Sequence, residues 1–225
     1  MPRALPFAGI VIGCIGALIL CAGIWLHFGN LVAAGLAVAA ITFVTGAFHE
    51  DGLADTSDGF GGGTTAERRL VIMKDSLIGS FGASALALAF IIRVAALGEV
   101  TGRLSLATAA GTIIVAAFLS RISALYILVA LPSAREDGLS RTVGKTSWSN
   151  YLSGLILAWI LSLAICVACG LPAFAWFAMP VAPLIVTFLM TQLSKRMIGG
   201  QTGDVAGASQ QLGEIAVYLA MLGAT

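Results

Sequence analysis

The chain has 225 residues, of which 59% are hydrophobic and only 10% are charged, and its formal net charge is +1. Soluble domains are typically about 45–50% apolar and about 25% charged, so this composition excludes an ordinary soluble protein and indicates an integral membrane protein. There is no basic arm or stripe that could contact phosphates along a duplex, so the sequence gives no reason to propose a nucleic-acid partner.

Apolar runs near the roughly 20 residues that a spanning helix needs recur along the chain. Six are clear and a seventh, at residues 205–222, is weaker. The six clear runs are 5–26, 31–48, 78–97, 104–131, 151–169 and 171–193. The pattern predicts an all-α, polytopic integral membrane helix bundle with six or seven transmembrane helices. We expect residues 1–225 to form a single membrane-embedded catalytic domain.

The distribution of Lys and Arg predicts the orientation of the bundle. Nine basic residues fall at one set of span ends and only Arg103 falls at the other. The nine are Arg3, Arg68, Arg69, Lys74, Arg135, Arg141, Lys145, Lys195 and Arg196. By the positive-inside rule, the polar segments 49–77, 132–150 and 194–204 are expected on the cytoplasmic side of the membrane.

Six of the eleven acidic residues lie in the first polar segment, and four of the six fall in the stretch FHEDGLADTSDGFGGG at residues 48–63. On a helix, Asp51, Asp55 and Asp58 share an arc of about 60°, at about 100° per residue, whereas Glu50 points elsewhere. Three carboxylates on one face repel one another, and a divalent cation would remove that repulsion. Mg²⁺ commonly combines carboxylates with substrate phosphates, so we predict Mg²⁺ ligands here. The alternative is a solvated acidic loop.

Further along the same segment, basic and acidic groups return to the same membrane face. Arg68, Arg69, Lys74 and Asp75 lie in an amphipathic stretch. Arginine and lysine beside a metal site would suit a pyrophosphate substrate, although the same residues could serve only as positive-inside charges.

Two arginines fall within apolar runs. Arg93 lies near the end of its run and is interpreted as a snorkelling side chain. Arg121 lies deeper, where a charge is expensive, so it is a functional candidate that pairs with a carboxylate or a phosphate, with a structural ion pair as the alternative. Near the C-terminal end of the chain, Asp204 follows Lys195 and precedes an Ala-rich helix, where it is either part of the site or only an N-cap.

Five blocks, in this order along the chain, resemble the cobalamin synthase family, the adenosylcobinamide-GDP ribazoletransferases. They are HEDGLADTSDG at 49–59, IMKDSLIG at 72–79, Ser120-Arg121, AREDGL at 134–139 and GGQTGD at 199–204. The acidic block and the last block together are specific for the family. One departure is that the position of Glu50 is more often apolar in the family, which argues against an essential role for this side chain.

The resemblance implies the final joining step of corrinoid assembly. A ribose hydroxyl of α-ribazole, or of its 5′-phosphate, would attack the cobinamide-linked phosphorus of adenosylcobinamide-GDP and expel GMP. Mg²⁺, the one expected cofactor, would be held by Asp51, Asp55 and Asp58. A nearby carboxylate or His49 would take the proton, and Asp75 is a further expected catalytic residue. The expected substrate-binding residues are Arg68, Arg69, Lys74, Arg121, Arg135, Lys195, Gln201 and Asp204. The oligomeric state stays open, with a homo-oligomer as one option.

Two other functions are considered. A CDP-alcohol phosphotransferase-like lipid synthase also uses aspartates at helix spacing, but its usual Gly-x-x-Ala-Arg does not follow Asp55 and Asp58, where the sequence continues to Phe60 and 61–63. A cation transporter would place carboxylates near the middle of the membrane, whereas nearly all acids here are expected at one interface.

Overall fold

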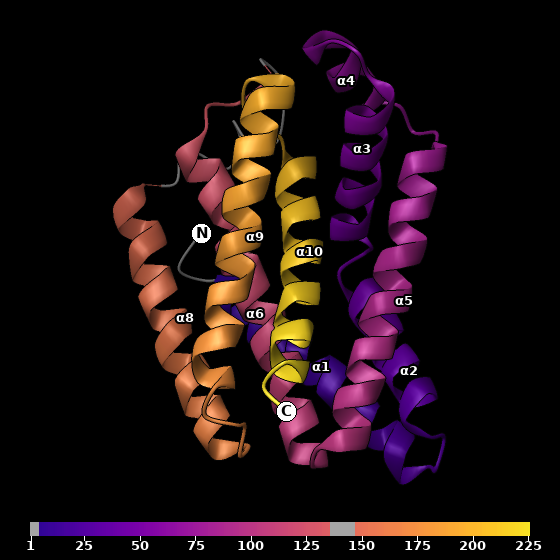
Figure 1. Ribbon diagram of the computed structural model, residues 1–225, viewed down its shortest axis with the longest axis vertical. Coiled ribbons are helices and arrows are strands. Elements are labelled where there is room, and N and C mark those ends of the chain that lie inside the picture. The colour runs from indigo at the N-terminus through magenta and orange to yellow at the C-terminus, as the bar shows by residue number, and fades with distance from the viewer. Residues whose placement is uncertain (1–4, 136–146) are drawn as a thin grey trace.

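The structure is a computed structural model that describes residues 5–135 and 147–225. Its helices are α1 (Leu5–Trp25), α2 (Asn30–Val44), α3 (Phe48–Gly62), α4 (Ala66–Ile72), α5 (Ser80–Arg103), α6 (Leu106–Ala130), α8 (Trp148–Ala168), α9 (Ala175–Ile198) and α10 (Gly203–Leu222). Figure 1 shows them packed side by side as a bundle, which confirms the predicted all-α class. The predictions for Arg3, Arg141, Lys145 and the block residues 136–139 fall outside the described residues.

Five of the described helices, α1, α5, α6, α8 and α9, are long and apolar enough to cross a membrane, judged by length and composition. A sixth span results if α2 and α3 are counted as one, although they are bent by 88°. The polytopic bundle is therefore confirmed, with five or six candidate spans. The weaker seventh run does form a helix, α10, but its polar residues keep it outside the candidate spans.

The bend between α2 and α3 interrupts the apolar run that was predicted as one span at 31–48. Gly46 and Ala47 both have positive φ, at 63° and 55°, and α2 stops at Val44. With 15 residues, α2 is about 22 Å long, which is short of the about 30 Å hydrocarbon core. After the bend, α3 runs between α5 and α10 toward α4 at one end of the bundle (Figure 1).

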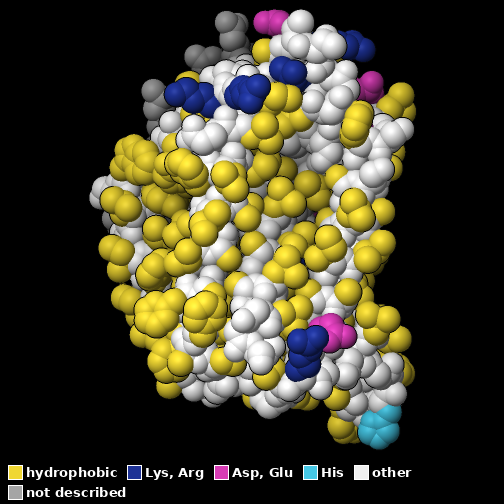
Figure 2. Space-filling model, viewed as in Figure 1, with side chains coloured by type: hydrophobic (Ala, Val, Ile, Leu, Met, Phe, Trp, Pro, Cys, Tyr) yellow, Lys and Arg dark blue, Asp and Glu magenta, His cyan; other side chains and the backbone are white. Residues whose placement is uncertain are grey.

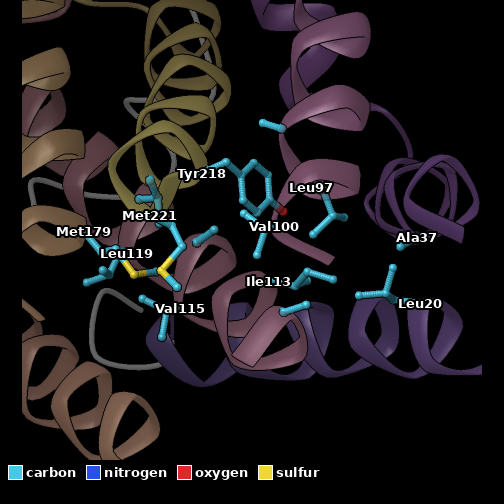
Figure 3. Close-up of a cluster of buried hydrophobic side chains, with 14 of the residues drawn as sticks. Leu20, Ala37, Leu97, Val100, Ile113, Val115, Leu119, Met179, Tyr218 and Met221 are labelled. Atoms are coloured by element: carbon cyan, nitrogen blue, oxygen red, sulfur yellow. The ribbon is translucent and has the colours of Figure 1, made fainter. Parts of the chain in front are cut away.

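The core is centred on α6, which contacts α1, α8, α9 and α10. Figure 3 shows side chains from several helices meeting there, among them Ile113 and Leu119 of α6 and Tyr218 of α10. Glycines let α1 approach closely, because a Cβ on Gly9 would lie 2.6 Å from the Cα atom of Phe118. Small residues at such crossings are the usual packing device of membrane helices.

The described parts of the three polar segments share one end of the bundle. Arg69 Nη1 donates to the carbonyl oxygen of Met197 at 2.9 Å, and the amide of Ala134 donates to the carbonyl oxygen of Gln201 at 2.9 Å. Figure 2 shows Lys and Arg gathered at this end and a mostly apolar flank below it. The opposite end carries an exposed ion pair between Glu99 and Arg103. The shared end agrees with the sequence, and its cytoplasmic orientation stays a prediction.

Cysteines placed at Thr64 and at Arg103 should react from opposite sides of the membrane, because α4 and the end of α5 lie at opposite ends of the bundle (Figure 1). In a variant whose native cysteines are alanine, an impermeant maleimide added to intact cells should label Arg103→Cys. It should reach Thr64→Cys only after the cells are opened. Labelling of Thr64→Cys in intact cells would contradict the predicted orientation.

Candidate functional site: an acidic cleft beside α3

The acidic segment is helical, so Asp51, Asp55 and Asp58 do lie on one side of α3 at the predicted spacing. Their surroundings differ along the helix. Asp51 is exposed, Asp55 is half-buried and Asp58 is buried. The three carboxylates are therefore chemically unequal, which the sequence pattern did not indicate.

Asp58 binds the start of α5. Its Oδ2 accepts a hydrogen bond from the amide of Gly79 at 2.7 Å, and its Oδ1 accepts one from the amide of Gly82 at 2.9 Å. A Cβ at either glycine would overlap the Asp58 carboxylate, so both positions depend on glycine. A carboxylate has about four lone-pair sites, so Asp58 can satisfy these amides and still offer an oxygen to a metal. Its role as a Mg²⁺ ligand stays a prediction.

A cleft of about 510 Å³ lies beside α3 and brings together four of the predicted site residues. These are Asp51, Asp55, Lys74 and Asp75. The other lining residues come from α2, α3, α5 and the turn after α4, and they are Thr42, Ala47, Glu50, Ala54, Met73, Ser76, Leu77, Ile78, Leu86 and Phe90. The cleft therefore combines acidic side chains, an exposed lysine and apolar residues. Asp75 Oδ1 accepts the amide of Leu77 at 3.1 Å, which orders the turn.

A second polar group lies where α3 meets the start of α10. A Cβ on Gly52 would come 2.7 Å from the carbonyl oxygen of Asp204, so glycine permits the close approach of the two helices. Arg135 Nη2 lies 3.1 Å from Asp204 Oδ2, and Asp55 interacts electrostatically with both. Burial raises the pKa of the Asp204 carboxyl, and Arg135 opposes that rise. Thr202 caps α10 by accepting the amide of Val205, so the alternative of Asp204 as the N-cap is wrong.

The remaining predicted binding residues are dispersed. Arg69 is bound to a backbone carbonyl of α9, and Gln201 is buried, with its backbone bonded to 132–134. Arg68 and Lys195 are exposed and have no ion-pair partner in the described part of the chain. The structure thus groups Arg135, Gln201 and Asp204, and it leaves Arg68 and Lys195 outside this group and outside the cleft.

Arg121 and His49 lie inside the bundle and do not line the cleft. Arg121 is 5% exposed and donates to the carbonyl oxygen of Ala117, on its own helix, at 2.6 Å. No carboxylate of residues 5–135 and 147–225 lies within ion-pair distance of it, although it interacts electrostatically with Glu214. His49 has a buried Nδ1 without a hydrogen-bond partner among these residues.

Sequence reasoning missed a group of charges in the middle of the bundle. Arg93 is fully buried near the centre of α5, where it donates to Glu50 at 3.0 Å and to Glu214 at 2.8 Å. The interpretation of Arg93 as a snorkelling side chain is therefore wrong. The available signal was one Arg and one Glu, each within a different hydrophobic run, since buried charges of opposite sign are expected to pair.

The carboxylates that line the cleft suit a Mg²⁺ ion that substrate phosphates also bind. Over the described residues, no three His, Cys, Asp or Glu side chains are close enough to form a metal site by themselves. Asp51 and Asp55, one helical turn apart, both line the cleft. Mg²⁺ is usually held by one or two carboxylates together with water and substrate phosphates, and this donor set matches that pattern.

The fold and the cleft define a multi-pass membrane protein with an acidic site at one end of its helix bundle. The family model for cobalamin-5-phosphate synthase matches residues 1–222, and the chain belongs to this family.

Curated relatives agree with the family match. The chain is 48% identical to an adenosylcobinamide-GDP ribazoletransferase of Azorhizobium caulinodans over 97% of its own length and 82% of the relative's. It is 46% identical to the Xanthobacter autotrophicus enzyme of the same name, with the same shares of both chains. A Sinorhizobium relative with this name is 41% identical, over 97% of this chain and 84% of the relative. No solved structure matches the chain.

The contact between Asp58 and α5 predicts that two glycine-to-alanine changes differ in their effect on stability. Gly82→Ala should destabilise the protein by about 1–3 kcal/mol, because the added methyl group overlaps the Asp58 carboxylate. Gly35→Ala is the matched control, since its Cβ would meet nothing closer than 3.8 Å, and it should be neutral or stabilising. Thermal unfolding in detergent measures both. Equal melting temperatures would contradict this placement of Asp58.

Proposed function

We propose that this protein is an adenosylcobinamide-GDP ribazoletransferase whose reaction takes place in the cleft beside α3. The observation that carries the proposal is the similarity to relatives of that name over 97% of the chain. It is supported by the cleft, which four carboxylates and a lysine line at the polar end of the bundle. We place this end in the cytoplasm of a bacterial inner membrane, following the positive-inside rule.

The proposed reaction is an in-line displacement at phosphorus. A ribose hydroxyl of α-ribazole, or of its 5′-phosphate, forms a new P–O bond to the cobinamide-linked phosphorus. The bond from this phosphorus to the bridging oxygen breaks, and GMP leaves with that oxygen. The products are adenosylcobalamin, or its 5′-phosphate, and GMP. The hydroxyl proton passes to a base of the protein.

Asp51 and Asp55 are the principal metal-binding residues in this proposal, and Asp58 adds an oxygen near the end of the same face. Bound Mg²⁺ would neutralise diphosphate charge and stabilise the charge that develops on the leaving group. Lys74 lines the same cleft and holds a substrate phosphate as a mobile point charge. Arg135 would bind phosphate from the side of Asp204.

Asp75 is the base that the geometry favours over His49. It lines the cleft and is exposed, and its Oδ2 is not used in the bond that Oδ1 makes to the amide of Leu77. His49 is not among the lining residues and lies against α10, where a Cβ on Gly207 would come 3.4 Å from its Cα atom. A base must come within hydrogen-bond reach of the proton it removes, and Asp75 is better placed for this.

The metal-binding role predicts a large and local loss of activity. In membranes supplied with adenosylcobinamide-GDP, α-ribazole and Mg²⁺, Asp51→Asn and Asp55→Asn should each lower GMP and adenosylcobalamin formation by several orders of magnitude. Glu67→Gln, which neutralises an exposed carboxylate on α4, is the control and should keep full activity. Full activity in Asp55→Asn would refute the metal assignment, and no activity in the wild-type protein would refute the proposed function.

The role of the basic residues predicts a ranking of kinetic effects. Lys74→Met and Arg135→Met should each lower kcat/KM for adenosylcobinamide-GDP, because each removes a charge-assisted bond to phosphate. The expected loss of transition-state stabilisation is about 2 kcal/mol for each change. Arg196→Met changes an exposed residue at the same end of the bundle and should have little effect. If all three changes have equally small effects, these residues serve only the orientation of the chain in the membrane.

A further inference from the structure

Arg93 joins three helices in the interior of the bundle. Its Nη1 donates to Glu50 Oε1 of α3 at 3.0 Å and to Gln211 Oε1 of α10 at 2.9 Å, and its Nη2 donates to Glu214 Oε1 of α10 at 2.8 Å. Arg93 and Glu214 are fully buried, and Glu50 is 3% exposed. The planar guanidinium group holds its partners in fixed directions, whereas the donors of a lysine ammonium group rotate freely.

Further hydrogen bonds extend this cluster to α2 and α6. Thr42 Oγ1 and Gln211 Nε2 each donate to Glu50 Oε1 at 3.1 Å, while Gln210 Nε2 donates to Glu214 Oε2 at 2.8 Å and to Ser120 Oγ at 3.0 Å. Residues Glu50, Arg93, Gln210, Gln211 and Glu214 are called the core charge network below. Five helices meet at this network.

The network binds the first turn of α3 through Glu50, where the helix has no side-chain N-cap. This helix begins after the 88° bend, its N-cap Ala47 has φ 55°, and no side chain caps its first turn. In the described part of the chain, the side chains of α3 that hydrogen-bond to other helices are Glu50 and Asp58. Glu50 lies in the first turn and Asp58 near the last.

Glu50 and Asp58, the two α3 side chains that bind other helices, flank Asp51 and Asp55 in the sequence. Glu50 and Asp58 both bind α5, one through Arg93 and the other through the backbone amides at its N-terminus. Asp51 and Asp55 lie between them in the sequence and line the cleft. Because a helix turns by about 100° per residue, a rotation of α3 by even part of that angle would redirect both carboxylates.

Stability alone is a weak explanation for such a network. Replacing a buried ion pair or triad with neutral residues of similar size is often neutral or stabilising, because charges are costly to desolvate. Buried charges fix the geometry of their partners in some proteins, and this role can be separated by experiment from a role in stability.

We propose that Arg93 is a positioning residue for the transfer reaction. By holding Glu50 and Glu214 together, it fixes the rotation of α3 against α5 and α10, and so fixes the direction in which Asp51 and Asp55 face the cleft. The inference rests on the proposed function for the reaction, whereas the geometry it describes is independent of that function.

Three variants separate positioning from stability. Glu50→Gln removes the ion pair to α3 and leaves Arg93 bound to Glu214. A triple variant combines Arg93→Met, Glu50→Gln and Glu214→Gln, which removes every ion pair of Arg93 and leaves Arg121 as the remaining charge of the core. Glu99→Gln, which breaks an exposed ion pair at the far end of the same helix, is the matched control.

Two measurements are made on each variant reconstituted in lipid. The first is the Mg²⁺ concentration that gives half-maximal GMP release, which should rise about tenfold to a hundredfold in Glu50→Gln and in the triple variant, the usual effect of losing a partner that orients metal ligands. The second is the spin-label distance between Phe48→Cys on α3 and Ile185→Cys on α9, both exposed positions, in a protein whose native cysteines are alanine. Its distribution should shift or broaden. Glu99→Gln should change neither.

The inference is overturned if Glu50→Gln and the triple variant keep the wild-type Mg²⁺ dependence and the wild-type distance distribution. It is also overturned if they yield less folded protein but the folded fraction behaves like the wild type, since the network would then serve stability only. If the wild-type protein releases no GMP, the proposed function fails, and the spin-label distances still decide whether the network sets the orientation of α3.

Discussion

A charge in the interior of a bilayer has to be compensated by the protein itself, because hydrocarbon offers no water to solvate it. Here the compensation is between Arg93 and Arg121 on one side and Glu50 and Glu214 on the other, all four buried. The two positive and two negative charges balance. Arg93 makes the direct contacts, whereas Arg121 contributes at longer range. The packing of α3 follows from this requirement, since Glu50 reaches Arg93 only if α3 runs down into the bundle.

The same helix connects the balanced core to the acidic cleft. Close approach of α3 to α10 depends on Gly52, and its attachment to α5 depends on the bonds from Asp58 to glycine amides. On the same helix, Asp51 and Asp55 line the cleft. An excess of negative charge at a membrane boundary is costly unless a cation balances it, and in the proposed function Mg²⁺ that binds together with the diphosphate would supply that cation.

Much of this arrangement was predictable, because it depends on local periodicity and composition. The helical spacing of the aspartates, the bundle class and the family all follow from residues close together in the sequence. The bend at Gly46 was not predictable, since the apolar run continues across it without a proline. The role of Asp58 as a cap for another helix, and the pairing of Arg93 with Glu214, depend on contacts between distant segments.

The deep carboxylates also bear on the transporter alternative. Acids near the middle of the bundle were expected only for a transporter, yet Glu50 and Glu214 are buried there. Both are bound to Arg93, so neither offers the unpaired carboxylate that a moving cation would need. Their position therefore reflects the core charge network and does not support transport.

The location of the metal tests the account most directly. Crystals of the protein grown with Mn²⁺ in place of Mg²⁺ and with a guanosine diphosphate-linked corrinoid would show the ion by its anomalous scattering. The account predicts a peak at coordination distance, about 2 Å, from the carboxylates of both Asp51 and Asp55, with the diphosphate extending toward Lys74. A fully occupied peak elsewhere, for example beside Asp204 with neither Asp51 nor Asp55 as a ligand, would contradict it.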